Sequence, residues 1–178
     1  MGAFEVKKSL NQKQLGLSLI EASMVLALSA VVVAGAVMYY GIASDNSKVQ
    51  RAMEQLSGVQ ATVATLYASQ SDYADLDSIA LQGSGALPNS YFNSDGKMIN
   101  PWSGEVEIKP AADKLSYTMK YKDVPTKACV KLVTTELGSG VKTVNINETG
   151  KKTLPLSLAD ANTGCSAGTT VSLEYEMK

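Results

Sequence analysis

Few side chains in this sequence could do chemistry, and one carboxylate stands apart from the others. Glu21 lies at the start of twenty residues, Ala22 to Gly41, that carry no charge. The 178-residue chain has no histidine, which removes the commonest general base and most designs for a zinc site. Two cysteines, Cys129 and Cys165, lie in the more polar remainder. An even number of cysteines beyond a membrane-targeting segment predicts one disulfide, formed in an oxidising compartment.

Two further patterns would serve an enzyme or a calcium protein, and both are incomplete. Ser139 and Lys142 have the spacing in which a lysine activates a serine on one helical turn, but glycines flank the serine. The stretch from Asn93 to Gly96 resembles the start of a calcium loop, but position 104 is glycine where the EF-hand needs a glutamate. Both patterns favour solvated turns. We therefore expect no enzyme activity, no metal and no cofactor, and keep an anchored or secreted enzyme or binding domain as an alternative.

Length and charge narrow the class of protein. After the apolar N-terminal segment is set aside, 178 residues leave room for one domain of ordinary size with a core of its own. The formal net charge is −1, whereas a nucleic-acid-binding protein normally carries a basic face or stripe. Nucleic acid is therefore not among the expected partners.

The apolar N-terminal segment has two simple interpretations. A secretory signal peptide would use Lys7, Lys8 and Lys13 as its basic region and residues 34–36 as its cleavage site, but its apolar region usually spans about 7–15 residues. A transmembrane anchor fits better, because about 20 residues rising 1.5 Å each cross a hydrocarbon core of roughly 30 Å. In the anchor, Glu21 is only a helix-terminal carboxylate favoured by the helix dipole, worth about 0.3–1 kcal/mol.

A third interpretation accounts for all of these residues. A basic leader ends at Gly16, the residues Leu17-Ser-Leu-Ile-Glu21 follow, and then the apolar run begins. This arrangement resembles the prepilin signature of type IV pilins. The resemblance implies that a dedicated membrane peptidase cuts between Gly16 and Leu17 and N-methylates the new amine of Leu17. The apolar helix would then stay in the mature chain, with Glu21 as its fifth residue.

The resemblance also implies a role for the carboxylate. When apolar helices of identical subunits pack together, the amine of Leu17 and the carboxylate of Glu21 are both buried away from water. Removing one partner of a buried ion pair typically costs about 3–5 kcal/mol. The Glu21 carboxylate of an incoming subunit is thus expected to pair with the Leu17 amine of its neighbour and to set the register of assembly.

The length of the leader indicates the class of pilin. Sixteen leader residues and a leucine at the first mature position are typical of type IVb pilins. The stretches YYGIASDNSK, NPWSGE and KACVKL are similar to bundle-forming pilins and to the pilins of plasmid conjugation pili. This resemblance implies a structural major subunit of a fibre used for adhesion, aggregation or conjugative mating contact. A minor pilin or a type II secretion pseudopilin is the alternative within the same family.

Partners and location follow from the same resemblance. The expected partners are identical subunits in a helical homopolymer, the prepilin peptidase and the pilus assembly machinery. The chain is expected in the inner membrane as a prepilin and then in an extracellular pilus on a Gram-negative cell.

The element that must position Glu21 is a long helix. It is predicted from Leu17 to about Ala68, where 52 residues extend roughly 78 Å. Its second half is amphipathic, with apolar residues at spacings of three and four at Val49, Ala52, Met53, Leu56, Val59, Val63, Leu66 and Tyr67. Gly35 and Gly41 interrupt the first half. They allow either close packing between membrane helices or, as the resemblance implies, local unwinding inside the filament.

The remainder predicts an antiparallel sheet, and therefore an α+β fold in which the long helix packs on the sheet. Alternating residues predict strands at 105–108, 115–121, 142–147 and 171–177, and a short helix at 128–137 closed by Gly138. We expect a leader at 1–16, a transmembrane or filament-core half-helix at 17–44, and a head at 45–178. The head divides into the amphipathic half-helix 45–68, a loop 69–101, and the sheet with its disulfide-bounded region 102–178.

A bond between Cys129 and Cys165 would span 36 residues, and the chain-entropy model assigns it about 4 kcal/mol. The resemblance implies a C-terminal bridge of this kind around an exposed variable region. A free reactive thiol is the alternative.

Overall fold

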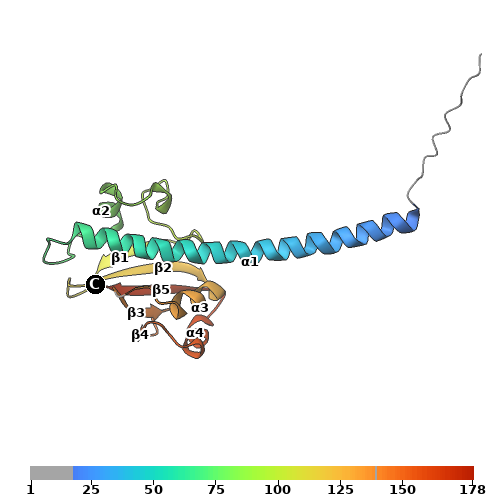
Figure 1. Cartoon of the computed structure of the whole chain (residues 1–178). Helices are drawn as coiled ribbons and strands as arrows, with labels where there is room; N and C mark the ends of the chain where they lie inside the picture. The colour runs from blue at the N-terminus through green and yellow to red at the C-terminus, as the bar shows by residue number, and fades with distance from the viewer. Residues whose placement is uncertain (1–17, 139) are drawn as a thin grey trace, which may run out of the picture. The chain divides into compact units, whose positions relative to one another are not determined.

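The computed structural model describes residues 18–138 and 140–178, so the predicted leader and the amine of Leu17 lie outside the described residues. The chain divides into two compact units, Met1–Ile42 and Ala43–Lys178. Helix α1 (Leu19–Leu66) contributes residues to both units. Among its described residues the second unit also contains a five-stranded antiparallel sheet, three shorter α-helices and a 3-10 helix (Figure 1).

Helix α1 is 48 residues long and confirms the predicted long helix to within two residues at each end. Its second half buries a single face, because Val49, Ala52, Leu56, Val59 and Val63 recur at spacings of three and four. One polar residue, Gln55, is buried on the same face. The sequence pattern therefore predicted which side of this half-helix enters the core.

The sheet has the strand order β1-β2-β5-β3-β4, with every neighbouring pair antiparallel. The strands are β1 (Val106–Pro110), β2 (Tyr117–Pro125), β3 (Val141–Ile146), β4 (Lys151–Thr153) and β5 (Thr170–Met177). Four of them confirm the predicted strands. Strand β4 was not predicted, because three residues, two of them lysines, give no alternation to detect.

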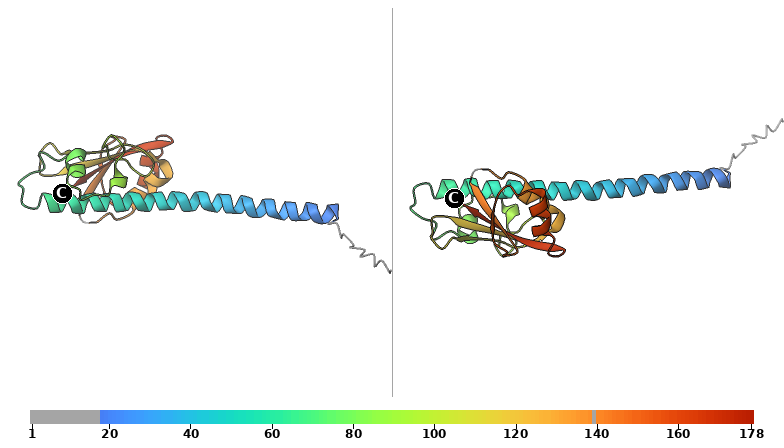
Figure 2. Two further views of the ribbon diagram at one scale, coloured as in Figure 1. Left: turned by 90° about the horizontal axis from the view of Figure 1, so that it is seen from above. Right: turned by 90° about the horizontal axis from the view of Figure 1, so that it is seen from below.

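One face of the sheet carries the core of the second unit. Along β2, for example, Tyr117, Met119 and Tyr121 are buried, and the residues between them are only partly covered. The second half of α1 lies along this sheet in each view (Figures 1 and 2). Buried residues of α1, the sheet and the short helices form one hydrophobic cluster. The predicted α+β fold is confirmed.

Helix α3 (Thr126–Thr134) begins two residues earlier than predicted and ends before Leu137, so the expected cap at Gly138 is wrong. The chain leaves the helix at Thr135, whose backbone is extended. The hydroxyl of Thr134 donates to the Val130 carbonyl at 2.8 Å, and that of Thr135 donates to the Lys131 carbonyl at 2.7 Å. These side chains satisfy carbonyls of the last turn, so no glycine cap is needed there.

The predicted loop 69–101 contains two short elements, helix α2 (Ser78–Gly83) and the 3-10 helix η1 (Asn89–Tyr91). Helix α4 (Leu158–Cys165) was also not predicted. Both α helices begin at a polar N-cap: Asp77 accepts from Ala80 N at 2.6 Å, and Ser157 accepts from Asp160 N at 3.2 Å. Helices of six and eight residues are too short for periodicity to distinguish them from loops.

Candidate assembly site

The first turn of α1 is closed by a reciprocal pair of hydrogen bonds between Ser18 and Glu21. Ser18 N donates to Glu21 Oε2 at 2.8 Å, and Glu21 N donates to Ser18 Oγ at 3.2 Å. This is a capping box, in which the N-cap serine and the glutamate three residues later satisfy two backbone donors that the helix leaves free. The Glu21 carboxylate is therefore held at the helix start by its own chain.

The capping box engages one carboxylate oxygen. Within the described part of the chain, Glu21 Oε1 receives no hydrogen bond. The first basic side chain after Glu21 is Lys48, 27 residues along the chain. A cationic partner close to this carboxylate would therefore come from the residues before Ser18, which lie outside the described residues, or from another molecule.

The helix that follows Glu21 exposes apolar side chains on every side. Its most apolar window has a mean hydropathy of 2.1 and no residue buried, so by length and composition the helix is able to cross a membrane. Twelve large apolar residues of this segment are more than half exposed: Met24, Val25, Leu26, Leu28, Val31, Val32, Val33, Val37, Met38, Tyr39, Tyr40 and Ile42. Such a surface is stable only when lipid or another protein covers it.

The two glycines of this segment lie inside a continuous helix. A Cβ atom at Gly35 or Gly41 would meet no atom within 4 Å in the described chain. Their predicted roles, close packing or unwinding in a filament, both concern contacts with other molecules and stay predictions.

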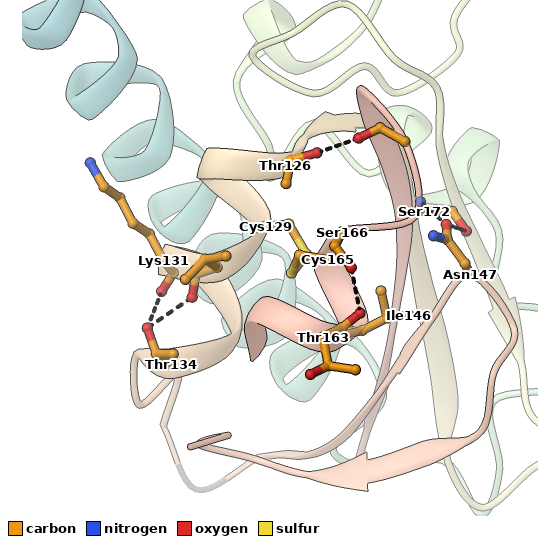
Figure 3. Close-up of a disulfide and its surroundings, with 12 residues drawn as sticks. Thr126, Cys129, Lys131, Thr134, Ile146, Asn147, Thr163, Cys165, Ser166 and Ser172 are labelled. Atoms are coloured by element: carbon orange, nitrogen blue, oxygen red, sulfur yellow. Dashed lines mark hydrogen bonds between the residues drawn. A yellow bond between two sulfur atoms is a disulfide. The ribbon is translucent and has the colours of Figure 1, made fainter. Parts of the chain in front are cut away.

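The predicted disulfide is present and joins α3 to α4. Cys129 and Cys165 are fully buried, with their Cα atoms 5.9 Å apart. Beside the bridge, Ile146 of β3 points toward α4 (Figure 3). A Cβ at Gly164 would lie 2.8 Å from Ile146 Cδ1, so a larger residue there would displace the end of the Ile146 side chain. The bridge thus holds two short helices against the core, and no free thiol remains among the described cysteines.

On the opposite face of the sheet, charged residues pair with one another. Lys122 of β2 lies 2.9 Å from Glu105 and also contacts Glu107, which is 2.8 Å from Lys109. Hydrogen bonds from Lys109 and Lys122 lower the pKa of Glu107 to about 2. The same pairing with Glu107 and Glu105 raises the pKa of Lys122. This face is therefore solvated and paired within one subunit, unlike the lone carboxylate of Glu21.

The stretch that resembles the start of a calcium loop forms a turn in the described residues. Asn93 Oδ1 accepts from Asp95 N at 3.0 Å and from Lys97 N at 2.9 Å, so that stretch is a turn stabilised by its own side chain. Ser139 lies outside the described residues. No cluster of three or more metal-ligating side chains occurs at 18–138 or 140–178.

Sequence reasoning missed two residues. Ser18 was overlooked as a cap, although Ser-x-x-Glu before an apolar run is the sequence signature of a capping box. Gln55 lies among the apolar positions of α1, where its type gave no hint that it is buried.

Comparison with known proteins points to one family. The bundlin family model matches residues 42–178. Over 192 aligned positions, covering 97% of this chain and the full length of the relative, the sequence is 34% identical to the major structural subunit of bundle-forming pilus from Escherichia coli O127:H6. The corresponding subunit from Escherichia coli O111:H- matches at the same identity and coverage.

The fold has a solved counterpart. The crystal structure of TcpA, a type IV pilin from Vibrio cholerae El Tor biotype, aligns with a TM-score of 0.51 and 15% identity over 74% of this chain and 99% of that one. At this identity the likeness concerns the fold alone. The family match and the relatives carry the identification: the chain belongs to the bundlin family and is a structural pilin subunit.

Proposed function

We propose that this pilin is the major subunit of a type IVb pilus and polymerises through the apolar half of α1. The exposed apolar surface between Ala22 and Gly41 carries the proposal. A helix that is apolar on all sides, in a chain that also contains a folded head, requires a large partner surface. Lipid supplies that surface before assembly, and identical helices supply it in the fibre.

Cleavage of the leader prepares the apolar helix to move from the lipid into the fibre. Cleavage after Gly16 would remove the basic leader and create a new amine at Leu17. The leader holds Lys7, Lys8, Lys13 and Glu5, so 13 basic and 16 acidic side chains remain and the mature chain carries −3 from its side chains. The prepilin peptidase and the assembly machinery are the partners that this step requires.

The Glu21 carboxylate then selects the neighbour. Because the capping box occupies Oε2, the other oxygen is available to accept from the Leu17 amine of an adjacent subunit. A carboxylate that is bonded to its own helix and to a neighbouring cation is better satisfied than one that has either contact alone. The cap and the ion pair therefore act together, and the pair adds the intermolecular contact.

Two observations favour a major subunit over a minor pilin or a secretion pseudopilin. Both relatives at 34% identity are major structural subunits, and the alignments cover them from end to end. The bundle-forming character of their pili supports adhesion and aggregation as the use of the fibre, with conjugative contact as the alternative. The proposed location is the inner membrane and then the surface of a Gram-negative cell.

The test is the composition of sheared surface fibres. We expect electron microscopy to show fibres labelled by antibody to this chain, and mass spectrometry to find this chain as their main component, beginning at an N-methylated Leu17. A control strain that carries Gly16→Val should retain the leader and lack fibres. A main component that begins near Val37, or surface fibres that lack this chain, would contradict the proposal.

A further inference from the structure

Gln55 is a buried polar residue on the face of α1 that packs on the sheet. Its side chain is 2% exposed. Gln55 Nε2 donates to the carbonyl of Ile99 at 2.9 Å, and Gln55 Oε1 accepts from the hydroxyl of Tyr121 at 2.9 Å. Tyr121 is itself fully buried on β2. One amide thus connects the helix to the sheet and to the segment that precedes β1.

The apolar residues on this face of α1 do not by themselves fix its position along the sheet. They are Val49, Ala52, Leu56, Val59 and Val63. If the helix slid by four residues, about 6 Å, their places would be taken by Met53, Leu56, Gln60, Val63 and Tyr67. Gln60 is the one amide in this second set, and the other four side chains are aliphatic or aromatic. Repeats at spacings of three and four give apolar burial little power to distinguish neighbouring registers.

The Gln55 contacts do distinguish them. After a slide of four residues Val59 would occupy the place of Gln55. The hydroxyl of Tyr121 would then be buried without this partner, which costs its desolvation, and the partly buried carbonyl of Ile99 would lose its hydrogen bond. A slide of seven residues would bring Thr62 there, whose short hydroxyl side chain cannot replace both contacts of an amide.

We propose that Gln55 is the positioning residue that sets the axial register of α1 on the sheet. A single buried polar residue has this role in coiled coils, where it selects one register among several that apolar packing allows. Register matters in a pilin because α1 is the polymerising element and the sheet carries the head. A defined register gives every subunit of a fibre the same position of the head along its helix.

The experiment measures the position of α1 directly, by pulsed electron spin resonance on the full-length chain in detergent. Spin labels are attached through genetically encoded ketone residues at the exposed positions Gln50 and Ala112, which leaves the disulfide intact. The two labels lie toward opposite ends of the packed half-helix. Gln50 is close in sequence to Asn46, which contacts Lys131 of α3 at the start of this half. Ala112 is close in sequence to Lys114, whose carbonyl accepts from the backbone N of Tyr73, just after the end of α1, at 2.9 Å.

We expect one narrow distance distribution for the parent protein. The double substitution Gln55→Leu with Tyr121→Phe removes the amide and the hydroxyl together and leaves an apolar contact of similar shape. We expect it to add a second population displaced by about 6 Å, one turn of α1. The single substitution Gln55→Met gives an independent test with a side chain of similar length, and we expect the same displaced population.

Gln60→Leu is the matched control, because Gln60 is a half-buried amide on the same helix outside the Gln55 contacts. Its distribution should stay narrow and centred on the parent distance. A folded Gln55→Met or Gln55→Leu/Tyr121→Phe protein with an unchanged single distribution would overturn the proposal. A displaced population in Gln60→Leu as well would also overturn it, since the register would then depend on helix packing in general.

Discussion

Valine side chains are exposed in the first half of α1 and buried in its second half. Val31, Val32 and Val33 are 61–71% exposed, whereas Val49, Val59 and Val63 are at most 3% exposed. The difference does not come from residue type. In the second half the valines alternate with polar residues on a helical period, and the sheet covers them. In the first half no face is polar, so no single covering surface within the chain would suffice.

The charges follow the same division. The first half of α1 has one charged residue, Glu21, and no cation beside it in the described chain. In the second unit four carboxylates, Glu105, Glu107, Glu148 and Glu176, have lysine partners within the same subunit. In this comparison the paired charges of the head find their partners within the subunit, while the apolar first half of the helix finds no covering surface in the described chain.

The largest expected effect comes from placing a charge in the half that needs outside partners. Val32→Lys puts an ammonium near the centre of the apolar segment, which costs about 2.5–3.5 kcal/mol in a membrane-spanning helix. We expect fibres to be lost, as counted by electron microscopy. Gln50→Lys places the same charge at an exposed position of the second half and should leave fibre numbers close to the parent level. Equal fibre numbers in the two variants would break the comparison.

The next effect concerns the disulfide between Cys129 and Cys165, which should contribute to the stability of the head. Replacing Cys129 and Cys165 together by alanine should lower the free energy of unfolding by about 4 kcal/mol without preventing membrane insertion. Denaturant titration followed by the fluorescence of Trp102, the sole tryptophan, measures this change. Ser166→Ala, beside the bridge, is the control and should change stability by about 0.5 kcal/mol or less. A double variant as stable as the parent would show that the bridge adds little to the head.

The smallest effect concerns the paired charges on the outer face of the sheet. Because the folded-state pKa of Glu107 is lowered to about 2 from an ordinary 4.5, its ion pairs stabilise the head above pH 4.5. That contribution is lost as the pH falls from 4.5 toward 2. Thermal unfolding at pH 5, 4, 3 and 2 should show a smaller decline for Glu107→Gln than for the parent. Identical declines would mean that these exposed pairs contribute nothing measurable.

Sequence reasoning succeeded where periodicity was long. The heptad-like repeat from Val49 to Val63 identified the buried face of α1, and clean alternation identified β2 and β5. It failed where a few side-chain hydrogen bonds decide the structure. Helix α3 ends at Thr134, where threonine hydroxyls bond carbonyls of its last turn, and α4 begins at a serine cap after an unpatterned stretch.

The candidate site was predictable only in part. Glu21 stands out because it is the only charge beside a long apolar run. Its hydrogen bonds with Ser18 follow from a local sequence signature, Ser-x-x-Glu before an apolar run. The buried role of Gln55 was beyond sequence reasoning, because it depends on Tyr121 and Ile99, 66 and 44 residues away along the chain.

The most direct test of the intermolecular ion pair separates the charge of Glu21 from its capping role. Glu21→Gln keeps a side chain that completes the capping box but removes the charge. Ser18→Ala removes the N-cap hydroxyl, at a cost of about 1 kcal/mol, but keeps the charge. Fibres per cell should be lost in Glu21→Gln and largely retained in Ser18→Ala, with both chains still cleaved after Gly16. Abundant fibres in Glu21→Gln, with loss of fibres in Ser18→Ala, would show instead that Glu21 serves only its own helix.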